Sequence, residues 1–160
     1  MCYEAGNKEH GLPNPKLNGP WSLVEIETFL HSTVIPVRLS AVSSAGWPTV
    51  VSLWFAYEAG TLRCASKGSA KIVRLLRSNP RCGFEISCET PPYFGVLGQG
   101  TVELDEGLGP KLLPNLMDRY VGSEETSFRR WLLARTDAEV AIVINPIRFM
   151  SWDYRKRMQR

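Results

Sequence analysis

The chain has 160 residues, of which 44% are hydrophobic, and it carries a formal net charge of +3. This size and composition favour one globular domain with a substantial core, and the weak positive charge gives no reason to expect a nucleic-acid partner. No apolar stretch is long enough for a membrane-spanning helix. The four cysteines, at positions 2, 64, 82 and 88, include no Cys-x-x-Cys pair, so we expect no metal site.

The first 20 residues are polar and rich in Gly, Pro and Asn. They lack the apolar core of a signal peptide, so we expect a cytoplasmic protein in which residues 1–20 form a flexible N-terminal segment and residues 21–160 form the domain. Ser22-Leu23-Val24-Glu25 has the spacing of a capping box, and apolar residues then recur on one helical face. This pattern predicts a helix over 22–31.

Strand patterns follow this helix. An alternating pattern predicts a strand over 34–43, and an almost continuously apolar run predicts a second strand over 49–57. Short turns that contain glycine separate the second strand from the first and from a third over 61–65. Successive hairpins of this kind indicate an antiparallel sheet.

The second half of the chain continues the β pattern around two helical stretches. A helix over 69–78 ends at Asn79-Pro80, a normal terminator, and a helical region over 110–136 is interrupted at Gly122-Ser123. The remaining predicted strands are 81–88, 94–104, 139–144 and 148–154, with a rigid Pro91-Pro92 loop after the first and Asn145-Pro146 between the last two. The fold class is therefore mainly β, an antiparallel split β-barrel with flanking helices.

The junction between the third strand and the helix that follows it is the most informative segment. Hydroxyl groups and cations gather there, in Ser66, Lys67, Ser69, Lys71 and Arg74. The first turn of a helix presents free N–H groups and a partial positive charge, so this junction indicates a seat for a phosphate group. The alternative is an ordinary surface helix with Ser69 as its N-cap.

Motifs for catalysis by side chains are absent. The chain has no Gly-x-Ser-x-Gly elbow, and Gly95-x-x-Gly98-x-Gly100 lies within a predicted strand, so it is no dinucleotide fingerprint. This absence fits a protein whose bound cofactor performs the chemistry. Trp54 and Trp152 are either core or interface residues, or walls for a flat ring.

Several motifs, in this order and spacing, resemble the pyridoxamine 5′-phosphate oxidase-like family of flavin-binding split barrels, from about Trp21 to Tyr154. They are Gly46-x-Pro48 with the strand after it, Gly68-Ser69-Ala70-Lys71, Ser78-Asn79-Pro80-Arg81, Thr90-Pro91-Pro92-Tyr93-x-Gly95-Val96-x-Gly98-x-Gly100, and Pro146-x-Arg148-Phe149-x-Ser151-Trp152.

The resemblance implies a homodimer that binds flavin mononucleotide (FMN) at the subunit interface and acts as an oxidoreductase on a small-molecule substrate. The backbone of Val51, Ser52, Leu53 and Trp54 would line the ring, and Cys64 and Ala65 would lie at further cofactor contacts. Ser69 and Lys71, with Ser66, would hold the phosphate. Gly95 would lie where a side chain of the partner subunit reaches the ring, and Trp152 would pack near it.

Two departures from the family keep alternatives open. Some members have arginine at the positions of Val51 and Ala70, and two lost charge-assisted hydrogen bonds of roughly 1.5–3 kcal/mol each would weaken FMN binding. A deazaflavin coenzyme is therefore an alternative cofactor, and a non-catalytic, dimeric cofactor-binding module is an alternative function. Haem binding is a third hypothesis, for which only His10 and His31 could supply an imidazole ligand.

Overall fold

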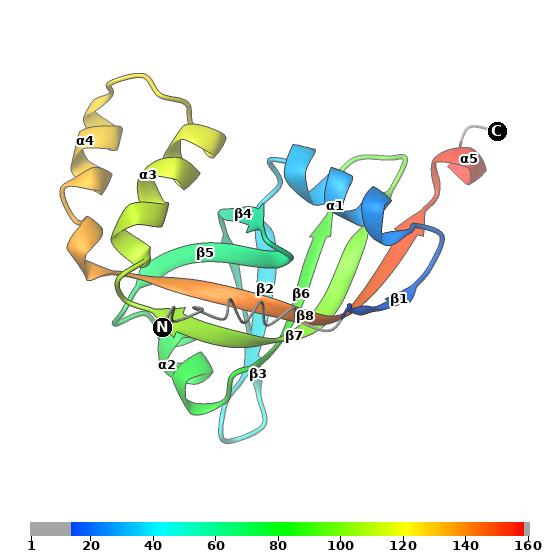
Figure 1. Ribbon diagram of the computed structural model, residues 1–160, viewed down its shortest axis with the longest axis horizontal. Coiled ribbons are helices and arrows are strands. Elements are labelled where there is room, and N and C mark those ends of the chain that lie inside the picture. The colour runs from blue at the N-terminus through cyan, green and yellow to red at the C-terminus, as the bar shows by residue number, and fades with distance from the viewer. Residues whose placement is uncertain (1–13, 159–160) are drawn as a thin grey trace, which may run out of the picture.

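The computed structural model describes residues 14–158 and consists of one curled sheet flanked by helices (Figure 1). The strands are β1 (Lys16–Asn18), β2 (Val37–Val42), β3 (Pro48–Leu53), β4 (Phe55–Glu58), β5 (Thr61–Lys67), β6 (Arg81–Ser87), β7 (Phe94–Asp105) and β8 (Glu139–Asp153). The helices are α1 (Leu23–Ser32), α2 (Lys71–Ser78), α3 (Gly109–Tyr120), α4 (Ser127–Leu133) and α5 (Arg155–Met158), with a 3₁₀ turn at Thr136–Ala138. This arrangement confirms the predicted fold class. Within the described residues, no helix is long and apolar enough to cross a membrane.

The strands follow the order β3-β2-β6-β7-β8-β5-β4, and every neighbouring pair on this path is antiparallel. The strands β3 and β4 therefore lie at opposite edges of the sheet, although only Trp54 separates them in the chain. The sheet is therefore curled so that its two edge strands come together at Trp54. The predicted single strand over 49–57 is thus wrong, because its two halves pair with different partners.

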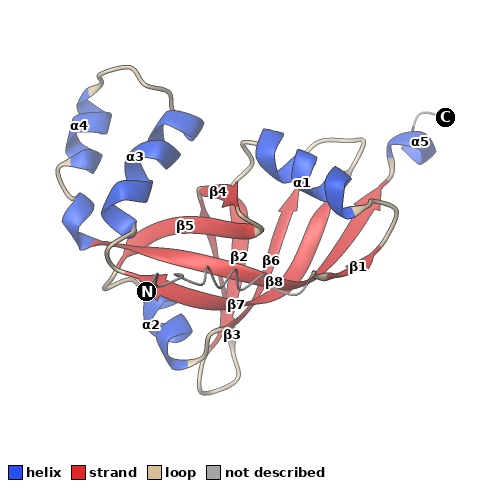
Figure 2. Cartoon of the chain, in the orientation of Figure 1, coloured by secondary structure: helices blue, strands red, loops and turns tan. Residues whose placement is uncertain are grey.

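The long strand β8 crosses the whole molecule, as Figure 2 shows. We predicted two strands interrupted at Asn145-Pro146, but the strand is continuous. The register against β7 shifts between Gln99 and Gly100, so that Ile147 is an extra residue in β8. A bulge accommodates a proline within a strand because it interrupts the ladder of hydrogen bonds locally.

The core fills the inside of the curl, where alternate strand residues meet. The side chains that are fully buried or nearly so include Leu39, Phe84, Ile144 and Phe149. The rings of Phe84 and Phe149 pack edge to face, with 5.7 Å between their centres. Phe55 is also completely buried.

Helix α1 closes one end of the barrel and begins as its sequence predicts. The Ser22 hydroxyl accepts a hydrogen bond from the Glu25 amide at 3.3 Å, and the Ser22 amide donates to the Glu25 carboxylate at 2.7 Å. This capping box holds the pKa of Glu25 below its usual value, through hydrogen bonds from Ser22. Ile26 and Leu30 face the core.

The sheet begins earlier in the chain than predicted. Lys16–Asn18 pair in parallel with Arg148–Met150, so these three residues belong to the sheet although they fall within the segment that we expected to be flexible. Residues 1–13 lie outside the described part of the chain.

Candidate functional site: a pocket beside the β5–α2 junction

The junction between β5 and α2 is built as a tight turn fixed to the sheet. The Gly68 amide donates to the Ala138 carbonyl at 2.9 Å, and a Cβ at Gly68 would lie 3.2 Å from Val140. Helix α2 begins at Lys71 with Ala70 as its N-cap, so the alternative in which Ser69 caps the helix is wrong. No side chain caps this helix, and its first turn contains no acidic residue. The N–H groups at its start are therefore free of side-chain partners.

The cations at this junction differ in what they contact. Arg74 donates to the Ser69 carbonyl at 3.1 Å and so stabilises the turn. Lys71 and Lys67 are exposed, and within residues 14–158 neither forms an ion pair. These two ammonium groups are available to an anion from solvent.

A pocket of about 340 Å³ adjoins the junction, between the β3–β5 edge of the barrel and helices α3 and α4. It is lined by Ser52, Leu53, Trp54, Ala65, Ser66, Lys67, Leu113, Leu116, Phe128, Trp131, Leu132 and Glu139. Most of these side chains are apolar, and three are aromatic. Such a lining favours a flat, largely apolar ligand that has a few polar groups.

Helix α3 holds one wall of the pocket in place. The Tyr120 ring stacks on Trp54 at 5.5 Å, with 13° between the planes. The Tyr120 hydroxyl donates to the Ile35 carbonyl at 3.3 Å and accepts from the Phe55 amide at 3.2 Å. Burial raises the pKa of Tyr120, so the hydroxyl stays protonated and its hydrogen bonds fix Trp54 indirectly.

Helix α4 covers the pocket with aromatic side chains that are half exposed. Phe128 and Trp131 stack at 6.1 Å, and the Arg135 guanidinium lies 4.6 Å from the centre of the Trp131 ring. No residue of α4 is buried. Polar contacts tie this helix to the rest of the chain: the Arg129 guanidinium pairs with Asp118 of α3 and donates to the Gly122 carbonyl at 3.1 Å.

Glu139 is a pocket residue that sequence analysis missed. It is the first residue of β8 and is only 7% exposed. Burial raises the pKa of its carboxyl, an effect that Lys67, its neighbour on β5, opposes. A charged residue at the start of an apolar strand is usually solvated, so the sequence carried only a weak signal for this position.

The structure brings together part of the predicted site. Ser52, Leu53, Trp54, Ala65 and Ser66 line the pocket. Ser69 and Lys71 lie beyond its lining, at the exposed start of α2. The prediction that all of these residues hold one cofactor remains a proposal.

Two predicted site residues face the core instead. The Val51 side chain packs on the main core, and Cys64 is fully buried there. Burial raises the pKa of the Cys64 thiol, so this side chain is an inert apolar residue. At both positions only backbone atoms are candidates for ligand contacts.

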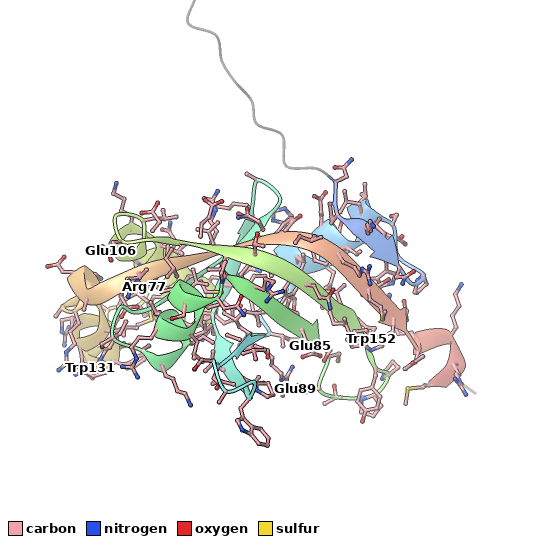
Figure 3. The ribbon with its side chains drawn as sticks, turned by 90° about the horizontal axis from the view of Figure 1, so that it is seen from below. Arg77, Glu85, Glu89, Glu106, Trp131 and Trp152 are labelled. Atoms are coloured by element: carbon pink, nitrogen blue, oxygen red, sulfur yellow. The ribbon has the colours of Figure 1, made fainter. Side chains whose placement is uncertain are left out.

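Gly95 and Trp152 form a separate group at the far end of β8, where they lie opposite each other on β7 and β8. A Cβ at Gly95 would lie 2.6 Å from the Ile86 carbonyl oxygen, so strand packing already requires glycine there. Figure 3 shows Trp152 and the pocket residue Trp131 toward opposite ends of the molecule. One chain therefore does not bring these two residues to the pocket.

A further hollow of about 500 Å³ lies on the outer face of the sheet, across β2, β6, β7 and β8. Val42 and Ile147 line it and are exposed, and Val50 and Trp47 are exposed on the neighbouring hairpin. Apolar side chains of this size gathered on one face are typical of a protein–protein interface.

The described part of the chain offers few candidate ligands for a metal ion or for the haem of the third hypothesis. Within residues 14–158, no three His, Cys, Asp or Glu side chains cluster as metal ligands would. His31 is exposed on α1, edge-on to the Tyr57 ring at 5.2 Å. His10 lies outside the described residues.

Comparison with known proteins relates this fold to solved structures. No protein-family model and no curated protein matches the chain. An F420 reductase superposes with a TM-score of 0.65 at 25% identity, over 77% of this chain and 94% of its own. A conserved hypothetical protein from Mycobacterium tuberculosis gives 0.72 at 24% identity, over 91% and 92% of the two chains.

A third solved structure relates this fold to pyridoxamine 5′-phosphate oxidases. A candidate pyridoxamine 5′-phosphate oxidase from Listeria innocua gives a TM-score of 0.62 at 18% identity, over 80% of this chain and 95% of its own. Together with the curled antiparallel sheet and the position of the β5–α2 junction, these likenesses show that the chain has the split-barrel fold of the pyridoxamine 5′-phosphate oxidase-like group.

Proposed function

We propose that this protein binds a phosphorylated flavin or deazaflavin and acts as an oxidoreductase on a small molecule. The observation that carries the proposal is the uncapped start of α2, with the free ammonium groups of Lys67 and Lys71, directly beside an aromatic pocket. The likeness to the F420 reductase supports a deazaflavin, and FMN is the other candidate.

The phosphate end of such a coenzyme fits the β5–α2 junction. Its anion would take the free N–H groups of the first turn and the charge of Lys71, with hydroxyl groups from Ser66 and Ser69. Neither Val51 nor Ala70 supplies a charged side chain here. Lys71 would therefore carry a large share of the anion binding.

The ring end fits the pocket. Trp54, clamped by Tyr120, offers a rigid flat wall, and the backbone of Ser52 and Leu53 at the barrel edge offers polar groups. When bound, a flavin-type ring supplies hydride transfer, which the side chains of the pocket do not provide. The chain's own residues would orient the ring and exclude water from it.

We further propose that the protein is a homodimer. The exposed apolar face around Val42, Val50 and Ile147 is the surface that a second copy would cover. Val50→Asp should then shift the protein toward monomer in sedimentation velocity, because it places a charge in an apolar contact. The matched control is Val24→Asp on α1, where the valine is 71% exposed, compared with 62% for Val50. A monomeric unmodified protein at micromolar concentration would contradict this proposal.

The cofactor proposal is tested by spectrum and titration. We expect absorbance of a co-purified flavin or deazaflavin, or else binding when FMN or coenzyme F420 is added. Lys71→Ala should weaken binding by about tenfold or more, because it removes a charge-assisted contact of roughly 1.5–3 kcal/mol. Lys111→Ala is the control, an exposed lysine in the first turn of α3. Absence of binding of either coenzyme would overturn the proposal.

A non-catalytic module that holds the coenzyme in a dimer is the second candidate. The apolar side chains at Val51 and Ala70, both packed against the core, favour it because they leave fewer groups for strong anion binding. Turnover with reduced nicotinamide and common electron acceptors separates the two functions. A protein that binds coenzyme and shows no turnover with any acceptor would support the module.

A further inference from the structure

Trp47 is the most exposed of the large apolar side chains that the structure describes. It is 74% exposed and follows the turn between β2 and β3, which projects beyond the rest of the ribbon in Figure 1. Within residues 14–158 its ring stacks on no other aromatic ring and lies under no cationic side chain. A side chain of this size is stabilised by leaving water, so its position favours a contact outside the chain.

The turn holds the backbone of Trp47 in a fixed position. The Trp47 amide donates to the Ser43 hydroxyl at 3.1 Å, and the Trp47 carbonyl accepts from the Ser43 amide at 2.9 Å. The Gly46 amide donates to the Ser43 carbonyl at 2.9 Å, and Gly46 has a φ of 83°, which glycine adopts without strain. Binding would therefore fix little more than the two side-chain torsions of Trp47, so its entropic cost is small.

The hollow on the outer face of the sheet includes a glycine that the chain itself does not require. A Cβ at Gly83 of β6 would meet no atom of the chain closer than the Gly98 carbonyl oxygen, at 3.9 Å. By contrast, a Cβ at Gly98 would lie 2.6 Å from the Arg148 carbonyl oxygen. Gly83 is also absent from the glycines with positive φ. Glycine weakens the interior of a strand and often marks a close approach by a ligand or another backbone, so this hollow is a candidate docking site.

The other residues that line the hollow suit an indole ring. Val42 and Ile147 supply apolar walls. Arg81 forms no ion pair within residues 14–158, and its Nε donates to the Asn79 side-chain oxygen at 3.3 Å, which orients the guanidinium at the rim. A guanidinium over an indole face is favourable, and the Gln99 side chain offers an oxygen to the indole N–H. The volume of about 500 Å³ leaves room for one such ring.

We propose that Trp47 of each copy inserts into this hollow on a second copy of the chain. The side chain and the hollow belong to one patch, because Val42 of the hollow and Trp47 flank the same turn. A two-fold axis places such a patch against its own copy, so both contacts form together. This inference rests on the proposed homodimer and names the contact that holds it together.

The area of this face is compatible with a stable dimer. Two copies of a tryptophan side chain bury about 300–500 Å² together, out of the roughly 1,200–2,000 Å² that a standard interface buries in total. The face continues from Gln99 of the hollow to Leu97, two residues along β7, and to Met150 opposite it on β8. Leu97 and Met150 are exposed, as is Val50, so these side chains, present twice, extend the apolar contact.

The test begins with two single variants, measured by sedimentation equilibrium without coenzyme. Trp47→Ala removes the inserted side chain, and Gly83→Leu fills the hollow that receives it. We expect each variant to raise the Kd of the dimer at least tenfold. Val24→Ala is the control, because this valine is 71% exposed and lies outside the hollow, and it should leave the Kd unchanged. A Kd that Trp47→Ala leaves unchanged would overturn the proposal.

A mixture of the two variants gives the sharper result. In a mixed dimer, Trp47 of the Gly83→Leu copy enters the open hollow of the Trp47→Ala copy, and the added leucine faces the space that the lost indole leaves. We expect the mixed dimer to have a Kd at least tenfold lower than either variant alone. Native mass spectrometry of an equimolar mixture should then show mixed dimers in excess of like dimers. A statistical mixture would overturn the proposal.

Circular dichroism checks that both variants keep the fold. We expect unchanged spectra, because Trp47 is exposed and a side chain at Gly83 meets no close atom of its own chain. If Gly83→Leu fails to fold, Trp47→Ala still decides the proposal.

The outcome is separable from that of the proposed function. A dimer that is insensitive to both variants would reject only the Trp47 contact. An unmodified chain that stays monomeric would reject the homodimer and this contact together. Binding of FMN or coenzyme F420 by that monomer would leave the cofactor proposal standing.

Discussion

Two carboxylates at the two ends of β8 have opposite surroundings. Asp153 accepts hydrogen bonds from the Trp21 indole at 3.2 Å and from the Arg155 Nε at 2.9 Å. These partners, Arg155 first, hold its pKa well below the usual value. Glu139 at the other end is buried without a donor, and burial raises its pKa.

The two ends of β8 differ in whether the protein itself supplies hydrogen-bond partners for the carboxylate. Trp21, Phe29 and Phe94 pack within 5.3–6.2 Å of one another, and Arg155 lies 4.6 Å from the Phe94 ring. The polar groups at this end are satisfied by the protein itself. At the pocket end, the Glu139 carboxylate accepts no hydrogen bond within residues 14–158, and the stacked side chains of Phe128 and Trp131 remain about half exposed.

The largest expected effect comes from Trp21→Ala. The side chain is almost fully buried, and its loss removes two aromatic contacts and the hydrogen bond to Asp153. We expect the free energy of unfolding, measured in urea, to fall by about 3–5 kcal/mol. Trp131→Ala at the pocket end should lower it by less than about 1 kcal/mol, because that side chain is half exposed. Similar losses in the two variants would contradict the assignment of different roles to the two ends.

A second prediction uses the opposite pKa shifts of the two carboxylates. A lowered folded-state pKa stabilises the fold above the ordinary value of 3.8, and this contribution is lost as the pH falls through the folded-state value. Asp153→Asn should therefore be less stable than the unmodified protein at pH 7, with the difference shrinking below pH 3.8.

For Glu139 the sign reverses. A raised folded-state pKa destabilises the fold once the pH exceeds the ordinary value of 4.5, because the unfolded chain ionises more easily. Glu139→Gln should therefore be more stable than the unmodified protein at pH 7 and similar to it below pH 4.5. Thermal unfolding across pH 3–8 measures both variants. A Glu139→Gln variant that loses stability at pH 7 would show that the carboxylate is paired after all.

The smallest expected effect comes from Lys67→Met. Lys67 opposes the upward shift of the Glu139 pKa, so its removal should move the titration of Glu139 to higher pH. Because Lys67 is exposed, the unfolding free energy should change by less than about 0.5 kcal/mol. NMR titration of the Glu139 side chain measures the shift, and a downward movement would contradict the prediction.

The sequence predicted what local patterns determine. Three features are each encoded within a few residues. They are the capping box at Ser22 and Glu25, the hairpin turn at Ala59-Gly60, and the end of α2 near Asn79-Pro80. The fold class followed from the alternation of strands and turns, and the ordered motifs identified the split barrel.

Features that depend on distant residues were predicted less well. Nothing in the apolar run around Trp54 marks the change of partner from β2 to β5, because the curl of the whole sheet causes it. Pro146 suggested a break in a strand that a bulge opposite Gln99 in fact accommodates. Glu139 lies in the pocket because α3 and α4 pack beside the start of β8, which no local pattern around Glu139 encodes.

The single residue between β3 and β4 has a consequence for how the barrel holds together. Neither edge strand pairs with the other in the described structure, so the covalent link through Trp54 and the packing of side chains inside the curl hold the two edges together. A chain cleaved between Leu53 and Trp54 would keep every antiparallel ladder, but it would lose the covalent link between the two edge strands. Proteolytic nicking at this joint should therefore lower the stability of the curled sheet more than a nick in the exposed connection between α3 and α4.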